Sequence, residues 1–201
     1  MGILKNDTVY EDEIFSGLKA VSLKVSRSTF EECQFLDCDL AEAEFDQCRF
    51  IECEFRDSNL NVTKLPGSRF FESQFKDCKV TGINWTSLDW TGITLSAPMA
   101  FESCDLSFSV FNSLSLPGLI VKNCKAWYAD FEACDLTHSV FTNTDLQDAR
   151  FNGTKLDKSD FDGAVNYYID PMGNSIREAH FDFPEVINLL KAFDIKIKGS
   201  Y

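Results

Sequence analysis

The side chains in this 201-residue sequence that could do chemistry are eight cysteines, two histidines and 32 acidic residues. Thiolates bind metals or pair as disulfides, and imidazoles and carboxylates act as general acids and bases. Zinc sites need Cys-x-x-Cys pairs with further Cys or His, and disulfide frameworks belong to small secreted chains. The sequence has neither pattern, so we expect no metal site and no disulfide framework.

The histidines, His138 and His180, have no catalytic companions at a useful spacing. Neither falls in a metal-binding or triad pattern, and the glycine motifs that bind phosphates, GxGxxG and GxxxxGK(S/T), are absent. We therefore expect neither an enzyme nor a cofactor-binding protein. The protein should act by binding another protein.

Most of these residues lie within a sequence repeat with a period of five residues. Every fifth residue is apolar from Tyr10 to Leu95 and again from Phe101 to Phe161, which makes 31 consecutive positions. A period of five fits neither a helix nor a flat strand. It does fit a chain that turns a corner every five residues, because the middle residue of each side then points inward. Four sides close a square coil of twenty residues, and coils can stack with a β-like spacing of about 4.8 Å.

The cysteines occupy one position in this repeat, two residues before the central apolar one. That side chain should also point inward, at a corner with little room. We therefore interpret the cysteines as small buried residues. Redox chemistry remains an alternative for Cys33 with Cys53 or Cys104 with Cys124, which lie one coil apart. The eight are Cys33, Cys38, Cys48, Cys53, Cys78, Cys104, Cys124 and Cys134.

The outward acidic residues of the first half stack in columns of like charge, because residues i and i+20 are vertical neighbours. Like charges about 4.8 Å apart repel by roughly 1 kcal/mol per pair even in water. Folding alone does not favour such columns, so we predict that they bind a partner. They are Glu32, Glu52 and Glu72 on one side and Asp37, Asp57 and Asp77 on the next.

Opposite charges alternate in the second half, which is the stabilising arrangement. The predicted stacks are Glu102 over Lys122, Asp105 over Lys125 over Asp145, Asp130 over Arg150, and Asp135 over Lys155.

The charge of the whole coil supports an acidic interaction surface. Residues 28–165 carry a net charge of −12 out of −13 for the chain. Over seven coils this is one charge per about 2.8 Å, against about 1.7 Å for duplex DNA. Such a rod can compete for a basic DNA-binding surface, whereas direct binding of nucleic acid is disfavoured. The alternative is that the acids keep a long β-solenoid soluble and its edges unpaired.

One interruption and two ends complete the organisation. The segment 96–100, SAPMA, adds one residue to the register, and Pro98 within it predicts a bulge or small protrusion. The coil should extend over 1–181. No segment is long and apolar enough to span a membrane, and no secretory signal precedes the repeat, so we expect a cytoplasmic protein.

Residues 182–201 predict a helix and a short strand that cap the open end of the coil. Asp182, Pro184 and Glu185 resemble a capping box. The apolar residues could also pair with a second copy through a two-fold interface. They are Val186, Leu189, Leu190 and Phe193 on the helix and Ile195 and Ile197 on the strand.

The repeat resembles that of the pentapeptide-repeat family, A(D/N)LXX, over almost the whole chain. This resemblance implies an all-β, right-handed quadrilateral β-helix. The segments GINWTSLDW (82–90), DGAVNYYIDP (162–171) and FPEVINLLKAFDIKI (183–197) resemble the albicidin-immunity and Qnr-type quinolone-resistance branch. That resemblance implies a DNA-shaped homodimer that engages DNA gyrase or topoisomerase IV and protects it from inhibitors. The alternative is an acidic scaffold for a different protein partner.

Overall fold

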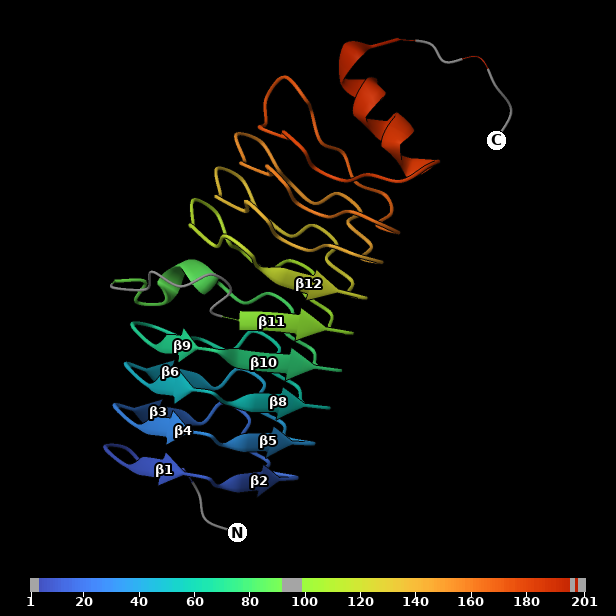
Figure 1. Cartoon of the computed structure of the whole chain (residues 1–201). Helices are drawn as coiled ribbons and strands as arrows, with labels where there is room; N and C mark the ends of the chain where they lie inside the picture. The colour runs from blue at the N-terminus through green and yellow to red at the C-terminus, as the bar shows by residue number, and fades with distance from the viewer. Residues whose placement is uncertain (1–3, 92–98, 196–197, 199–201) are drawn as a thin grey trace.

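The protein is a stack of β-coils with the N-terminus at one end and a helix at the other (Figure 1). The structure, a computed structural model, describes residues 4–91, 99–195 and 198. The strands are β1 (Val9–Glu11), β2 (Ile14–Ser16), β3 (Lys24–Ser26), β4 (Thr29–Glu31), β5 (Gln34–Leu36), β6 (Glu44–Asp46), β7 (Arg49–Ile51), β8 (Glu54–Arg56), β9 (Arg69–Phe71), β10 (Ser73–Lys76), β11 (Met99–Glu102) and β12 (Ile120–Lys122). Two 3₁₀ helices are η1 (Trp85–Ser87) and η2 (Glu185–Phe193).

All strand pairings are between successive coils and all are parallel. The sheets run β1-β4-β7-β9, β12-β11-β10-β8-β5-β2 and β3-β6. Phe30 pairs with Phe50, which places residues i and i+20 side by side. Hydrogen bonds run both ways from each coil: Glu52 N donates to Phe71 O (2.8 Å) and Glu54 N to Cys33 O (3.0 Å). The predicted β-solenoid with twenty-residue coils is confirmed.

The aromatic residues predicted to face inward form the core. Phe50 stacks between Phe30 and Phe70, with ring centroids 4.9 and 4.6 Å away and nearly parallel planes. Each of these rings is at most 3% exposed. The column departs from the prediction at Trp90, which is only partly buried and whose indole N–H donates to Trp85 O (3.0 Å). Stacked rings therefore hold consecutive coils together from the inside.

The interruption is larger than the single residue predicted for 96–100. Phe75 pairs with Phe101 in the strands β10 and β11, an offset of 26, so six extra residues lie between these coils. Most of that segment lies outside the described residues, and the predicted protrusion around Pro98 is among the positions not described. Counting by fives could not distinguish one residue from six, because both shift the phase of the repeat by one.

Helix η2 covers the C-terminal end of the stack, but the predicted capping box does not form. Pro184 takes the cap position with near-helical angles, and within the described chain Asp182 Oδ1 has no hydrogen-bond partner. Glu185 instead accepts from the backbone N–H of Asn166 (3.3 Å) and from the side chain of Asn188 (2.6 Å). Glu185 thus ties the helix to the last coil. Neither helix of the described chain has the length and apolar character needed to cross a membrane.

The predicted C-terminal strand is not present at Ile195, which follows the helix as an exposed residue outside any strand. Ile197 lies outside the described residues. In the part of the chain that the structure describes, helix η2 is therefore the only regular element after the last coil.

The cysteines are free thiols and occupy the inward corner position predicted for them. None is more than 4% exposed. Cys53 Sγ donates to the carbonyls of Phe30 (3.3 Å) and Ile51 (3.4 Å), which satisfies the thiol in the protonated form. Burial raises the pKa of Cys53 to about 12, and the neighbouring Cys124 thiol together with burial raises the pKa of Cys104 to about 12. Cys53 and Cys104, one thiol of each candidate redox pair, are therefore protonated at neutral pH, and all four thiols of these pairs are buried.

We expect the Phe50→Ala variant to be destabilised by about 3–5 kcal/mol, because it removes a ring that is stacked on both sides and leaves a cavity. Chemical denaturation of the variant and the parent protein measures the difference. Phe50→Leu, which fills part of the space, should cost less. A loss below about 1 kcal/mol for Phe50→Ala would show that the stack contributes little to stability.

We expect the folded protein to be inert to Ellman's reagent at pH 8, because all eight of its thiols are buried. In denaturant all eight cysteines should react, which provides the control within the same sample. Rapid reaction of two or more thiols in the folded protein would contradict this expectation and restore the redox alternative for Cys33, Cys53, Cys104 and Cys124.

Candidate partner-binding surface

Three glutamates stack at one corner of the first coils and form what we call the glutamate column: Glu32, Glu52 and Glu72. The backbone N–H of Glu32 donates to Ile51 O (2.9 Å), and that of Glu52 donates to Phe71 O (2.8 Å). Each glutamate therefore lies one coil from the next, as the columns of twenty predicted. All three side chains are exposed.

The next corner carries the aspartate column: Asp37, Asp57 and Asp77. Their backbone N–H groups donate to Arg56 O (3.1 Å), Lys76 O (3.1 Å) and Glu102 O (3.0 Å) of the following coils. Strands β5, β8 and β10 run between the two corners, so the columns border one face of the rod. The structure thus brings all six predicted acids to the edges of a single face.

The left-handed backbone at the corners accounts for the residue type of the aspartate column but not for that of the glutamate column. Glu52 has φ 51° and Asp57 has φ 50°, both in the left-handed region. That conformation costs roughly 1–2 kcal/mol for most residues, but the short side chain of Asp tolerates it. The aspartates therefore suit the turn locally. The glutamates have no such advantage, so the glutamate column is the part of the surface that backbone geometry does not explain.

No ion pair compensates the charges of the two columns, although Arg56 interacts electrostatically with Asp57 and Asp77 of the aspartate column. None of the six acids forms an ion pair with another residue in the described ranges. In the second half, the predicted pairing is observed for Asp105 with Lys125 (3.5 Å), Asp130 with Arg150, and Asp135 with Lys155 (3.2 Å). The acidic surface is thus confined to one part of the rod.

All the predicted stacks of the second half are observed as direct neighbours, but not every stack forms an ion pair. Glu102 pairs with Lys76 of the preceding coil (3.9 Å) rather than with Lys122 of the following one. The register itself is as expected, because Glu102 and Lys122 are direct strand partners. The six-residue insertion places Lys76 beside Glu102, and a count with a one-residue slip could not place it there.

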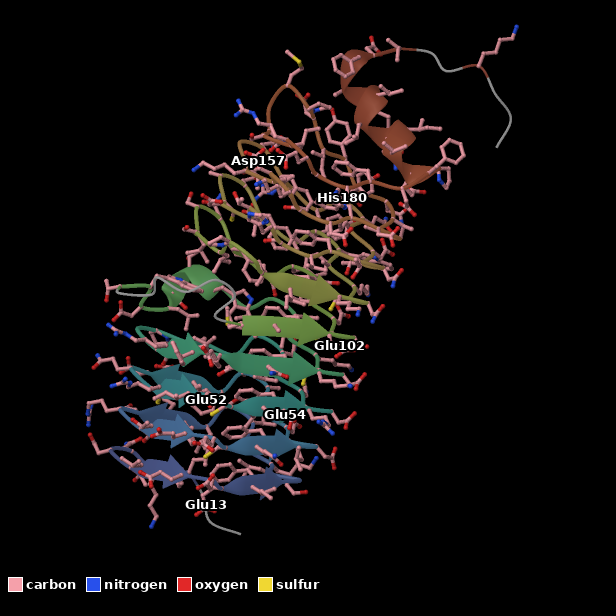
Figure 2. The ribbon with its side chains drawn as sticks, in the orientation of Figure 1. Glu13, Glu52, Glu54, Glu102, Asp157 and His180 are labelled. Carbon is pink, nitrogen blue, oxygen red and sulfur yellow. The ribbon has the colours of Figure 1, made fainter. Side chains whose placement is uncertain are left out.

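Shallow grooves run along the glutamate column. One of about 370 Å³ is lined by Glu32, Glu52 and Glu72 together with Glu54 of β8. A second of about 240 Å³ extends it toward the N-terminus, lined by Glu11, Asp12, Glu31 and Glu32. Figure 2 shows Glu52 and Glu54 near each other on one side of the stack. Sequence reasoning missed Asp12, although it lies twenty residues before Glu32 and could have been found by extending the column.

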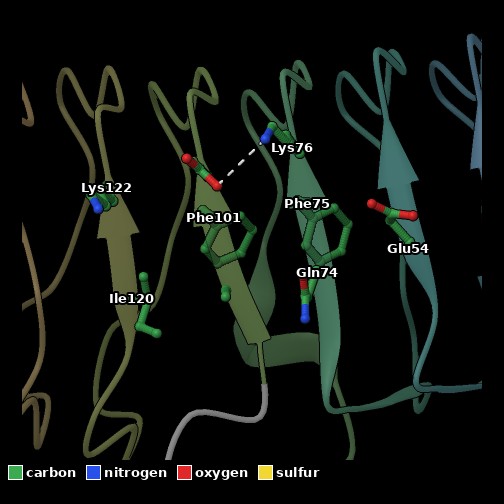
Figure 3. A pocket seen from close by; sticks show the side chains of 9 residues that line it. Glu54, Gln74, Phe75, Lys76, Phe101, Ile120 and Lys122 are labelled. Carbon is green, nitrogen blue, oxygen red and sulfur yellow. Dashed lines mark ion pairs between the residues drawn. The ribbon is translucent and has the colours of Figure 1, made fainter.

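The acidic face ends at a groove of about 250 Å³ on strands β8, β10, β11 and β12 (Figure 3). Lys76, paired with Glu102, and Lys122 line this groove together with the apolar side chain of Ile120. Basic residues therefore mark the boundary between the unpaired acids of the first coils and the balanced charges beyond.

The residues predicted for dimerisation are divided between two environments. Leu189 packs against the core and Val186 is partly buried, so both help to hold the helix on the stack. The side chains of Leu190, Phe193 and Ile195 remain 40%, 47% and 53% exposed. An apolar surface that a second copy could cover is therefore present, but it is smaller than predicted.

The remaining titratable candidates are not brought together. His138 is exposed at a corner in the left-handed conformation, and His180 lies in the last coil beside Asp160. Over residues 4–91, 99–195 and 198, no three His, Cys, Asp or Glu side chains are grouped to hold a metal ion. The arrangement supports binding through charge and offers no catalytic constellation in these ranges.

Comparisons with known proteins find solved structures and a family to which this chain is similar. Among solved structures, a trypsin-treated variant of QnrB1, a plasmid-mediated fluoroquinolone resistance protein, is 14% identical with a TM-score of 0.56; the match covers 96% of this chain and 99% of that one. HetL, a pentapeptide repeat protein involved in heterocyst differentiation regulation from Nostoc sp. strain PCC 7120, is 12% identical over 87% of this chain and 84% of its own, with a TM-score of 0.40. No curated protein sequence matches the chain.

The family described as Pentapeptide repeat region matches residues 28–97 and 98–165. Because these matches span more than half of the sequence, the chain belongs to the pentapeptide-repeat family.

Proposed function

We propose that this protein is a non-enzymatic mimic of DNA that binds DNA gyrase, with topoisomerase IV as a second target, and modulates the enzyme or protects it from inhibitors. The acidic face occupies the basic surface on which the topoisomerase binds DNA. The resemblance of three segments to the Qnr-type and albicidin-immunity branch supports the choice of this partner. Resistance or immunity to an antibiotic is the corresponding biological role.

The unpaired glutamate column is the observation that carries the proposal. Three exposed carboxylates at successive coils repel one another, and neither backbone geometry nor ion pairing compensates. A regular row of negative charge is what a DNA-binding surface recognises through its phosphate contacts. Electrostatic attraction of this kind raises the association rate and falls with salt concentration.

An acidic scaffold for a different protein is the second candidate. The same unpaired acids favour it, since they would serve any basic partner. It predicts a binding partner other than a topoisomerase, and no effect on the supercoiling reaction.

A supercoiling assay tests the proposed function. We expect the protein to inhibit gyrase at high concentration, or to restore its activity in the presence of a gyrase inhibitor. No inhibition and no rescue from any inhibitor tested would reject gyrase as the partner. The same assay with topoisomerase IV decatenation tests the second target.

Neutralising both columns should weaken binding and stabilise the fold. For Glu32→Gln, Glu52→Gln, Asp37→Asn and Asp57→Asn together, we expect gyrase affinity to fall about tenfold or more, because four charges that face the enzyme are lost. The Tm should rise by about 2–4 °C, since like-charge repulsion is relieved. Biolayer interferometry and thermal unfolding measure the two effects.

A charge-matched pair of variants provides the control for that experiment. Glu52→Gln with Asp57→Asn removes two charges from the columns, and Asp162→Asn with Glu178→Gln removes two exposed charges near the other end. Only the first pair should weaken binding. If both pairs weakened binding equally, net charge alone would determine affinity. If neither pair weakened binding, the columns would be explained by solubility and not by partner binding.

We further propose that the protein is a homodimer through its C-terminal helix. Light scattering should give about twice the chain mass of 22.8 kDa at micromolar concentration. Leu190→Glu with Phe193→Glu should convert it to a monomer, because both exposed side chains would place charge in the interface. A parent protein that scatters as a monomer would contradict the dimer.

A further inference from the structure

A third corner of the rod carries a column of a different character, which we call the aromatic column: Glu42, Val62, Gly82, Phe108, Tyr128 and Asp148. Its members are vertical neighbours. The N–H of Gly82 donates to Ser107 O (2.9 Å), that of Phe108 to Trp127 O (2.8 Å), and that of Tyr128 to Gln147 O (2.9 Å). The column lies on a different corner from the glutamate and aspartate columns, and its apolar members extend into the second half of the rod.

Two exposed aromatic rings stack in this column. Phe108 is 61% exposed and Tyr128 is 48% exposed, and their ring centroids lie 5.1 Å apart with planes 6° from parallel. Both residues have left-handed backbones, with φ 62° and 56°. Bulky residues rarely adopt this conformation, and it costs roughly 1–2 kcal/mol each. Two large aromatic side chains at strained, exposed positions are unfavourable for folding and solubility. We therefore interpret them as residues that contact a binding partner.

Gly82 leaves a gap in the column directly beside Phe108. Within this column, no side chain of the described residues lies between Phe108 and Val62, whose backbones are two coil steps apart, or about 9.6 Å. The gap is not forced by crowding, since a Cβ at Gly82 would meet Val62 Cγ2 at an ordinary 3.6 Å. A flat group entering the gap can stack on the free face of the Phe108 ring, as Tyr128 does on the other side.

The charges around the gap favour a cation. Glu42 and Asp148 bracket the apolar stretch, both are exposed, and neither has an ion-pair partner within the described ranges. Glu42 accepts a hydrogen bond from the Ser22 hydroxyl (3.3 Å), and Asp148 interacts with the Tyr128 hydroxyl. The flanking columns are balanced. Lys79, Asp105, Lys125 and Asp145 alternate on one side, and Lys24, Glu44 and Lys64 on the other. The uncompensated charge of the column is therefore negative at both ends.

A cation already sits on a ring next to this column. Lys125 Nζ lies 3.8 Å from the centroid of the Trp127 ring, while pairing with Asp105. The corner thus contains one cation–π contact made within the chain and, one coil away, an exposed ring face without one. Arginine is the side chain that combines a planar shape, a positive charge and weak hydration, and it stacks readily on aromatic rings.

We propose that Phe108, Tyr128 and the gap over Gly82 form a docking site for an arginine side chain of a protein partner, whose guanidinium stacks on the free face of Phe108. The nearest acids of the column, Glu42 and Asp148, lie two and three coils from the gap and attract the cation only at longer range. The site is separate from the acidic face. It deepens the proposed function, on which it rests for the identity of the partner, by adding an aromatic anchor to an interaction otherwise based on charge. Aromatic and arginine residues are the side chains that most often dominate protein interfaces.

Asparagine variants test the site in the complete protein with gyrase as the probe. Asn occupies equivalent left-handed corners in this chain, at Asn123 and Asn143, so Phe108→Asn with Tyr128→Asn should fold with an unchanged or higher Tm. We expect gyrase affinity to fall about tenfold or more. Gly82→Asn, which fills the gap and keeps both rings, should weaken binding similarly. Val9→Asn, at an apolar residue 62% exposed on another face, is the control and should not.

A second probe tests the site independently of gyrase. Acetyl-arginine amide and acetyl-norleucine amide are titrated into labelled protein while the ring resonances of Phe108 and Tyr128 are followed by NMR. Arginine should shift both resonances saturably, norleucine should not, and Gly82→Asn should abolish the shift. Absence of an arginine-selective shift, or full gyrase affinity in the Phe108→Asn with Tyr128→Asn variant, would overturn the docking site. If arginine binds but the parent protein does not bind gyrase, the proposed function fails and the docking site stands.

Discussion

Hydrogen bonding between coils is the constraint on which the whole molecule depends. Each coil donates backbone N–H groups to the coil above and the coil below, as Glu52 and Glu54 do, so successive coils must keep the same dimensions. Equal dimensions require a corner every five residues, and the corners require left-handed backbones. The central residue of each side then always faces inward. The Phe stacks, the buried thiols and the external columns of side chains all follow from this register.

The register explains how much of the molecule its sequence predicts. The inward positions of Phe30, Phe50 and Phe70 follow directly from the period of five, as do the corner positions of the cysteines. The extra residues before Phe101 could not be counted, because six residues and one residue give the same phase. The pairing of Glu102 with Lys76 was missed for the same reason. At the C-terminus no repeat constrains the chain, and local preferences at Asp182 were overridden by contacts between Glu185 and the last coil.

The candidate surfaces were predictable to different degrees. The six acids of the two columns could be found from their spacing, since vertical neighbours are twenty residues apart. The structure adds the backbone conformation at each corner, where φ is in the left-handed region. Aspartate tolerates this conformation, whereas glutamate has no such advantage. The left-handed backbone and the exposure of the side chain also identify Phe108 and Tyr128. A search for columns of like charge could not find these two residues, because neither is charged. Their meaning depends on the gap at Gly82 and on an offset of 26 that the sequence does not reveal.

The division between inward and outward positions also has a consequence for how such a protein changes over time. Side chains such as Glu52 lie outside a core whose packing is complete without them, and the backbone that carries them is held by neighbouring coils. A substitution at one of these corners therefore alters the external pattern of charge or shape without requiring any repacking inside. Binding preference and foldability can then vary independently. The outward corner positions recur at a fixed spacing along the rod, so the side chains that a partner contacts can change one residue at a time.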